Sequence, residues 1–226
     1  MSSDNNKRIA KNTALLYFRM LFLMFIGLYT SRVNLQSLGV DNFGIYNVVG
    51  GVVAMFSVLT ASLGVAISRD ITFELGKGNI EKLNKVFSSA VTIQIIISIV
   101  VVIIAELLGV WFLNNKMVIP SDRLYAANWV FQFSIMSFVL TLISVPYNAC
   151  IIAHERMSAF AYFTIYEAIM KLVVAYTVFI TPFDKLITYA ALLLFIAFTM
   201  RLIYGVYCTK HFTECHYHFV FDKKML

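Results

Sequence analysis

Six long apolar stretches follow one another along this chain and leave few folds open to it. A helix needs roughly 20 apolar residues to cross a bilayer, and only helices or closed barrels satisfy their backbone hydrogen bonds there. These stretches are continuously apolar rather than alternating, which indicates helices. We therefore predict an all-α integral membrane protein with six transmembrane helices, at about Thr13–Ser37, Phe43–Ser68, Phe87–Leu113, Leu124–Ile152, Met157–Ile180 and Ile187–Cys208.

The composition excludes an ordinary soluble domain. Of the 226 residues, 60% are hydrophobic and only 13% are charged, whereas soluble domains carry about 25% charged residues. The first stretch is not a cleavable signal peptide, because its apolar run is too long and Arg19 interrupts it. The chain therefore reads as a multi-pass protein that keeps its first helix.

Lysine and arginine are distributed unevenly between the two sides of the predicted bundle. Eleven of the 18 fall on the side of the N-terminus and three on the opposite side. The positive-inside rule then places both termini in the cytoplasm, and we expect a cytoplasmic (inner) membrane protein. The net charge of +6 reflects this topology. It does not indicate a nucleic-acid partner, because the basic residues are spread over separate loops.

Five charged residues within the apolar stretches are candidate substrate-binding residues, because each is costly in a membrane. An arginine at the centre costs roughly 2.5–3.5 kcal/mol on insertion scales. The first stretch holds two cations and no carboxylate, which suggests an anionic ligand. The five are Arg19, Arg32, Glu106, Glu167 and Lys171.

Spacing along the helices predicts how these charges meet. At the helical rise, Arg32 and Glu106 each lie about 9–10 Å below the outer ends of their helices. They could form a pair or share a water-filled cavity. Glu167 and Lys171 are four residues apart on one helix face, so they either neutralise each other or line a hydrophilic lumen. Arg19 either faces that lumen or extends to the headgroups.

Features of enzymes and metalloproteins are weak in this sequence. It has no G-x-x-x-x-G-K-[ST] phosphate loop and no helical His-x-x-x-His pair. Several residues of the types that bind metals gather near the C-terminus, namely Cys208, His211, Cys215, His216 and His218. Their spacing matches no standard zinc site. We expect no enzymatic activity, no cofactor and no metal.

Local signals predict two further features. Asn79 follows Gly78 and is placed to cap a helix in which Glu81 precedes Lys85 by one turn, so we expect a surface helix leading into the third apolar stretch. Pro146 lies within the fourth stretch and is expected to kink or break that helix.

Several segments resemble those of one transporter family. The segment between the first two apolar stretches reads Leu38-Gly39-Val40-Asp41-Asn42-Phe43-Gly44-Ile45-Tyr46. It resembles the LG-x3-[FY]-G-x-Y turn of polysaccharide (O-antigen type) flippases. These flippases belong to the MATE-like multidrug/oligosaccharidyl-lipid/polysaccharide exporter superfamily. Further similar segments are Gly64–Arg69, Gly76–Asn84, Pro146-Tyr147-Asn148, Ala153-His154-Glu155-Arg156 and His211-Phe212-Thr213-Glu214-Cys215.

The resemblance implies a two-lobe transporter of which this chain is the N-terminal lobe. Residues 1–208 would be that six-helix lobe. Residues 209–226 would be a cytoplasmic tail that begins the linker to a second lobe, and the alternative is a half that dimerises. Such proteins turn a lipid-linked pyrophosphate oligosaccharide from the cytoplasmic to the outer leaflet during surface polysaccharide biosynthesis. Cations of the first helix, here Arg19 and Arg32, would meet the pyrophosphate.

Two other functions compete with this one. A drug/cation antiporter of the same superfamily would need buried carboxylates near a cation site, and only Glu106 and Glu167 lie deep. A truncated, non-transporting membrane protein is the other alternative. We expect membrane lipids as partners in every case.

Overall fold

A computed structural model describes residues 2–215, apart from the side chains of residues 2–9, 11 and 59, and within this range every regular element is helical. The first helix is by far the longest, with 53 residues, and a short π-helical turn interrupts the third apolar stretch. The elements are α1 (Ser2–Ala54), α2 (Ser57–Lys77), α3 (Ile80–Ile104), the π-helix η1 (Ala105–Gly109), α4 (Val110–Asn115), α5 (Leu124–Ala153), α6 (Met157–Ile180) and α7 (Lys185–His211).

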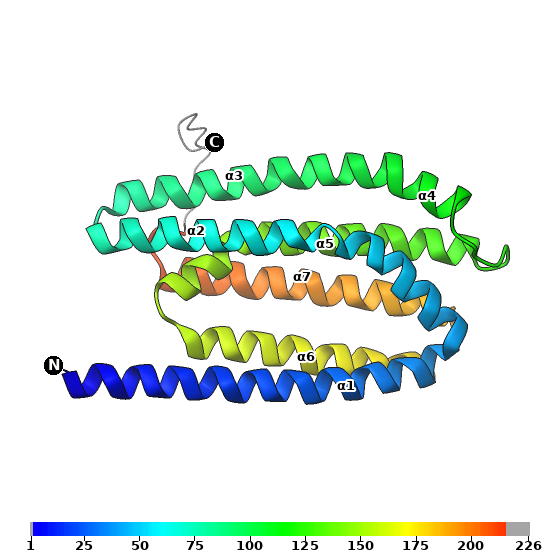
Figure 1. Ribbon diagram of the computed structural model, residues 1–226, viewed down its shortest axis with the longest axis horizontal. Helices are drawn as coiled ribbons and strands as arrows, with labels where there is room; N and C mark the ends of the chain where they lie inside the picture. Colours follow the sequence, from blue (N-terminus) through cyan, green and yellow to red (C-terminus); the bar gives the residue numbers. More distant parts are fainter. Residues whose placement is uncertain (1, 216–226) are drawn as a thin grey trace.

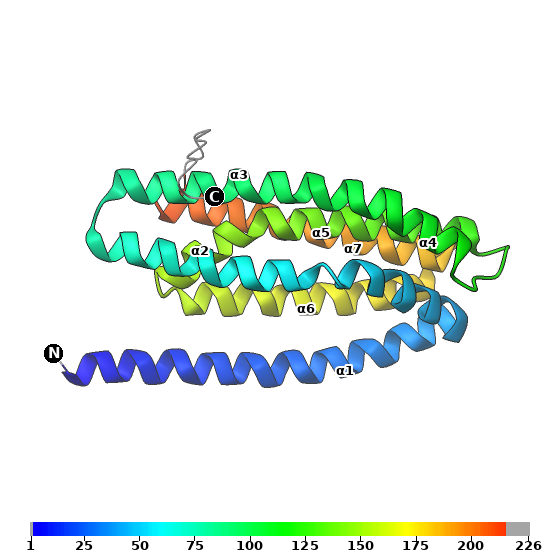
Figure 2. The ribbon, with the colours of Figure 1, turned by 45° about the horizontal axis from the view of Figure 1, so that its top comes forward.

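The helices form an elongated bundle whose members run along its long axis (Figures 1 and 2). The start of α1, the α2–α3 turn, the α5–α6 turn and the end of α7 gather at one end, which we call the proximal end. The α1 bend, the α4–α5 loop and the α6–α7 turn form the distal end. The turns and helix ends that carry most of the loop lysines and arginines therefore share the proximal end, as the charge pattern predicts.

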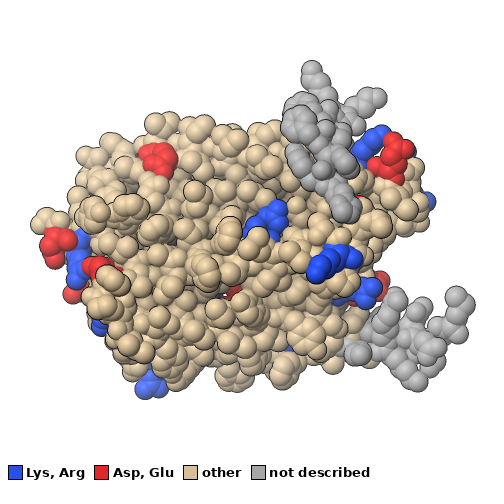
Figure 3. All heavy atoms as spheres, turned by 180° about the vertical axis from the view of Figure 1, so that it is seen from behind, with Lys and Arg blue, Asp and Glu red and all other residues tan. Residues whose placement is uncertain are grey.

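The membrane assignment is confirmed in its coarse form. Five helices are long and apolar enough to cross a membrane: Asn12–Ala54, Ile80–Asn115, Leu124–Ala153, Met157–Ile180 and Lys185–His211. On the face of the bundle seen in Figure 3, charged side chains are sparse along the middle and gather mainly toward the two ends.

The junction between the first and second stretches differs from the prediction. No loop spans residues 38–42, because helix continues up to and after Gly39, which alone leaves helical geometry at φ 78° and ψ 166°. This conformation is essentially restricted to glycine. A first arm (residues 2–38) and a second arm (residues 40–54) of α1 therefore meet at one residue, and the chain reverses there (Figure 2). The second stretch is itself divided by a turn at Met55 and Phe56 before α2 begins.

The local signals had mixed outcomes. Gly78 ends α2 in the left-handed conformation, and the Asn79 side chain accepts a hydrogen bond from the Lys82 amide at 3.0 Å. The helix cap is thus confirmed. Of the two outcomes expected at Pro146, a kink or a break, the break does not occur, because α5 continues through Pro146 to Ala153; the kink stays a prediction. Neighbouring helices can compensate for the backbone hydrogen bond that proline removes inside a membrane bundle.

Close packing of α5 against its neighbours holds the bundle together. Helix α5 makes its largest interface with α7 and also contacts α2 and α3, while the main neighbour of α1 is α6. In the distal core, the Phe131 ring covers the π-helical turn where Gly109 lacks a side chain. A Cβ at Gly109 would lie 2.3 Å from Phe131 Cζ. Glycine at this position therefore permits the approach of α5 to the π-helical turn.

Candidate functional site

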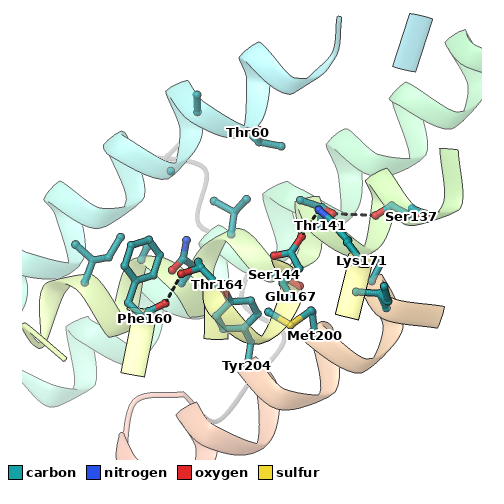
Figure 4. A pocket seen from close by; sticks show the side chains of 18 of the residues that line it. Thr60, Ser137, Thr141, Ser144, Phe160, Thr164, Glu167, Lys171, Met200 and Tyr204 are labelled. Carbon is teal, nitrogen blue, oxygen red and sulfur yellow. Dashed lines mark hydrogen bonds and ion pairs between the residues drawn. The ribbon is translucent and has the colours of Figure 1, made fainter. Parts of the chain in front are cut away.

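A cavity of about 770 Å³ lies inside the bundle, bounded by α2, α5, α6 and α7. Its wall combines apolar side chains such as Met200 and Phe160 with hydroxyl groups and one ion pair. Figure 4 shows the polar side chains converging from the four helices. They are Thr60, Ser137, Thr141, Ser144, Thr164, Glu167, Lys171 and Tyr204.

Two of the predicted site residues form an ion pair in this wall. Lys171 Nζ lies 2.6 Å from Glu167 Oε1, and the two side chains are 48% and 35% exposed. Four-residue spacing on α6 places them on one face, as the sequence predicts. The pair adds opposite charges and no net charge to the cavity.

Arg19 lies beside the cavity on the first arm of α1. Its guanidinium carbon is 4.2 Å from the ring centroid of Phe160, which lines the cavity. A cation above an aromatic face is attracted by the ring electrons. The Nε atom of Arg19 is buried and has no hydrogen-bond partner, so this cation keeps a donor unused within the protein.

The other two predicted site residues lie elsewhere. Arg32 is exposed, and neither Arg32 nor Glu106 lines the cavity. The predicted pairing of Arg32 with Glu106 is not formed. Glu106 Oε2 instead accepts a hydrogen bond from Gln132 Nε2 on α5 at 3.1 Å. Equal depth was a poor guide, because depth along a helix says nothing about the face on which a side chain lies.

A group of polar contacts at the distal end was missed by the sequence reasoning. Asn34 Nδ2 on the first arm donates to Tyr189 Oη on α7 at 2.8 Å. The Tyr189 ring packs edge-on against Tyr46 of the second arm, with centroids 4.8 Å apart. Tyr46 also lines the cavity, so this group bounds it toward the distal end. Residues so distant in sequence carry no local signal of their contact.

A second group of contacts joins the segment after α7 to the proximal end of the bundle. The four residues that follow α7 turn back onto the bundle, where the buried Glu214 carboxylate pairs with the His154 ring. Phe212 stacks on His154 with centroids 4.1 Å apart, and Asn84 Nδ2 on α3 donates to the Glu214 carbonyl oxygen at 3.0 Å. We call residues 212–215 the strap.

The cysteines of this region are buried structural thiols. Cys150, Cys208 and Cys215 are free and buried. A hydrogen bond with Cys150 and burial both raise the pKa of the Cys215 thiol. Among the side chains that the structure describes, no three His, Cys, Asp or Glu residues are arranged to hold a metal ion. Two of the ligand-type residues, His216 and His218, lie outside the described residues, as does the expected tail from residue 216 onward.

A second hollow of about 780 Å³ lies at the distal end, between the α1 bend and the α4–α5 loop. Its charged lining residues include Asp41, Asp122 and Arg123. Arg123 Nη1 is bound to Asp184 Oδ2 at 2.7 Å, so its charge is already engaged. This hollow lacks the row of hydroxyl groups that distinguishes the central cavity.

Comparison with known proteins decides the family. Residues 9–226 match the family described as polysaccharide biosynthesis protein. The chain belongs to this family. No curated protein and no solved structure matches the chain in the corresponding searches. Membership gives this multi-pass membrane protein a role in polysaccharide biosynthesis or export, and it agrees with the flippase family that the sequence resembles.

Proposed function

We propose that this chain is one lobe of a flippase that moves a lipid-linked pyrophosphate oligosaccharide from the cytoplasmic to the outer leaflet. The observation that supports this best is the hydroxyl-lined cavity of about 770 Å³ within a helical bundle of the polysaccharide biosynthesis protein family. A polar cavity surrounded by an apolar belt offers a route for a hydrophilic headgroup through a membrane.

The membrane arrangement follows from the bundle. We take the second arm of α1 together with α2 as the sixth pass, since this segment runs back along the bundle from the distal to the proximal end (Figure 1). The positive-inside rule then puts the proximal end, and both termini, in the cytoplasm of a cell with an inner membrane.

Arg19 is the cation best placed for the pyrophosphate in this scheme. It lies beside the cavity with an unused Nε donor, and arginine binds phosphate oxygens through several donors at once. A cation antiporter would instead need a carboxylate free to bind its cargo. Here Glu167 is paired with Lys171, and Glu106 accepts from Gln132.

A second lobe or a second copy is proposed to complete the path. Lys171 keeps 48% of its side chain exposed although it lines the cavity, which is consistent with further protein covering that side.

The function can be tested by reconstituting the chain in liposomes with a polyisoprenyl pyrophosphate that carries a tagged disaccharide. Translocation would expose inner-leaflet glycan to a glycosidase added outside, at a rate above that of empty liposomes. A rate that grows with the square of protein density would support a second copy. A rate equal to that of empty liposomes at every protein density, despite confirmed insertion, would contradict transport by this chain alone or with a second copy, and would favour a non-transporting protein.

A further inference from the structure

Five hydroxyl groups of the cavity wall have a common hydrogen-bonding arrangement. Each of the five donates its hydrogen to a carbonyl oxygen of its own helix, at distances of 2.6–3.1 Å. The bonds run from Thr60 to Ser57, from Ser137 to Phe133, from Thr141 to Ser137, from Ser144 to Leu140 and from Thr164 to Phe160. Five hydroxyls from α2, α5 and α6 thus donate their only hydrogen to a carbonyl oxygen of the protein.

A hydroxyl whose hydrogen is engaged in a hydrogen bond still has lone pairs that can accept. Toward the cavity, these five groups therefore act as hydrogen-bond acceptors. The Glu167 carboxylate is also an acceptor, and the buried Oδ1 of Asn148, another lining residue, has no partner in the protein. Acceptors from three helices thus face the same space (Figure 4).

Donor groups are fewer. Glu167 holds the Lys171 ammonium at 2.6 Å, which occupies one of its three hydrogens. The Asn148 amide and the Ser68 hydroxyl are the other lining groups with hydrogens of their own. The phenol groups of Tyr46 and Tyr204 can donate or accept hydrogen bonds, so they can also accept from a ligand that is rich in donors. A pyrophosphate has only acceptor oxygens at neutral pH, and it would meet like groups across most of this wall.

We infer that this wall holds the uncharged, hydroxyl-rich part of the ligand, namely a neutral glycan whose O–H and amide N–H groups donate to it. This inference rests on the proposed function and assigns the two ends of its ligand to different places. The glycan lies against the acceptors of α2, α5 and α6, while the pyrophosphate stays near Arg19 at the edge of the cavity. A glycan that carries carboxylates is disfavoured, because its carboxylate oxygens would face the lone pairs of the five hydroxyls.

The test compares two lipids on the purified chain in nanodiscs: a polyisoprenyl pyrophosphate with a neutral disaccharide and the bare polyisoprenyl pyrophosphate. Binding is measured by native mass spectrometry. The double substitution Thr141→Val and Thr164→Val removes two acceptors while keeping side-chain shape. We expect it to weaken binding of the glycolipid about tenfold, from roughly threefold per lost hydrogen bond, and to change binding of the bare lipid less than twofold.

Two further variants keep the result interpretable if valine perturbs the fold. Thr141→Ser together with Thr164→Ser retains both acceptors and should bind like the wild type. Thr177→Val removes a hydroxyl of α6 that also donates to its own helix, at Val173, but lies outside the cavity, and it should have no effect. A disaccharide of uronic acids on the same lipid should bind about tenfold more weakly than the neutral one.

The outcomes separate the inference from the function on which it rests. If the wild type binds the glycolipid and the valine variant binds it equally well, the inference falls and the flippase proposal stands. Equal losses for both lipids, or a serine variant as weak as the valine variant, also overturn the inference. If the wild type binds the glycolipid and the bare lipid equally well, the inference also falls while the flippase proposal stands. If the wild type binds neither lipid, the proposed function falls and the inference falls with it.

Discussion

Lys171 Nζ lies 2.6 Å from Glu167 Oε1 across one turn of α6, within the wall of the central cavity. The two charges cancel where a ligand would pass. A cation or an anion left alone at this point would either bind a charged headgroup too strongly or repel it. The pair therefore lets the wall be polar without favouring one sign of charge.

Neutralising one partner should impair transport more than exchanging the two. Glu167→Gln leaves an uncompensated ammonium in the wall, and we expect transport in the liposome assay to fall at least tenfold. The exchange Glu167→Lys with Lys171→Glu restores neutrality and should retain about half of the activity. Glu81→Gln is the matched control, because it breaks the exposed Glu81–Lys85 pair of the same spacing on α3. Equal loss in the exchanged and single variants would contradict this role.

Arg19 and Arg32 should differ in their contribution although both belong to the first arm. Arg19→Ala removes the cation beside Phe160 and should weaken binding of bare polyisoprenyl pyrophosphate about tenfold, since hydrogen bonds to charged groups contribute roughly 1.5–3 kcal/mol. Arg32→Ala changes an exposed side chain outside the cavity and should alter binding less than twofold. Binding can be measured by native mass spectrometry, and the reverse order of effects would refute the assignment.

Gly39 should tolerate no side chain. Its φ of 78° with ψ of 166° lies in a region that costs other residues roughly 1–3 kcal/mol. Gly39→Ala is therefore expected to lower the free energy of unfolding by that amount, measured by denaturant titration in detergent. Gly27→Ala offers a control, because it lies in the same helix with open space around it. A destabilisation by Gly27→Ala as large as that of Gly39→Ala would argue against backbone strain.

Gly109 should be intolerant for a different reason, namely contact with Phe131. Gly109→Ala places a Cβ only 2.3 Å from Phe131 Cζ, and overpacking of this kind costs roughly 1–3 kcal/mol. Adding Phe131→Leu should recover part of the loss, because it removes the ring carbon that clashes. Thermal unfolding of the single and double variants tests this coupling, and strictly additive losses would exclude it.

Cys215 should stay unreactive as the pH rises. An unperturbed thiol ionises near pH 8.5, and the thiolate is the reactive form. The raised pKa of Cys215 favours the protonated thiol in the folded protein. Alkylation by iodoacetamide should therefore remain slow from pH 7 to 9. A cysteine placed by Thr213→Cys, at an exposed position of the strap, should react faster over the same range. Rapid labelling of Cys215 in the folded wild type would contradict the buried arrangement.

The sequence predicted those parts of the structure that depend on local spacing. The apolar stretches indicated the membrane helices, Asn79 indicated a cap, and four-residue spacing predicted the Glu167–Lys171 pair. Each of these features is determined within one or two helical turns.

Features that depend on how helices rotate against one another could not be predicted in the same way. Glu106 contacts Gln132 instead of Arg32 because the face of a long apolar helix is set by packing, and uniformly apolar helices carry little information about their faces. The reversal at Gly39 was expected as a loop, since a glycine inside an apolar run gives no sign that one residue suffices. The cavity itself arises only when four helices come together.

The strap has a mechanical consequence. Through Glu214 it ties the proximal ends of three helices together: Asn84 belongs to α3, His154 directly follows α5, and the strap continues α7. These three helices are thereby joined to one another at the proximal end. If the proximal end is to widen, we expect these three helices to stay together, and Gly39 is the one residue within α1 at which its first arm leaves helical geometry.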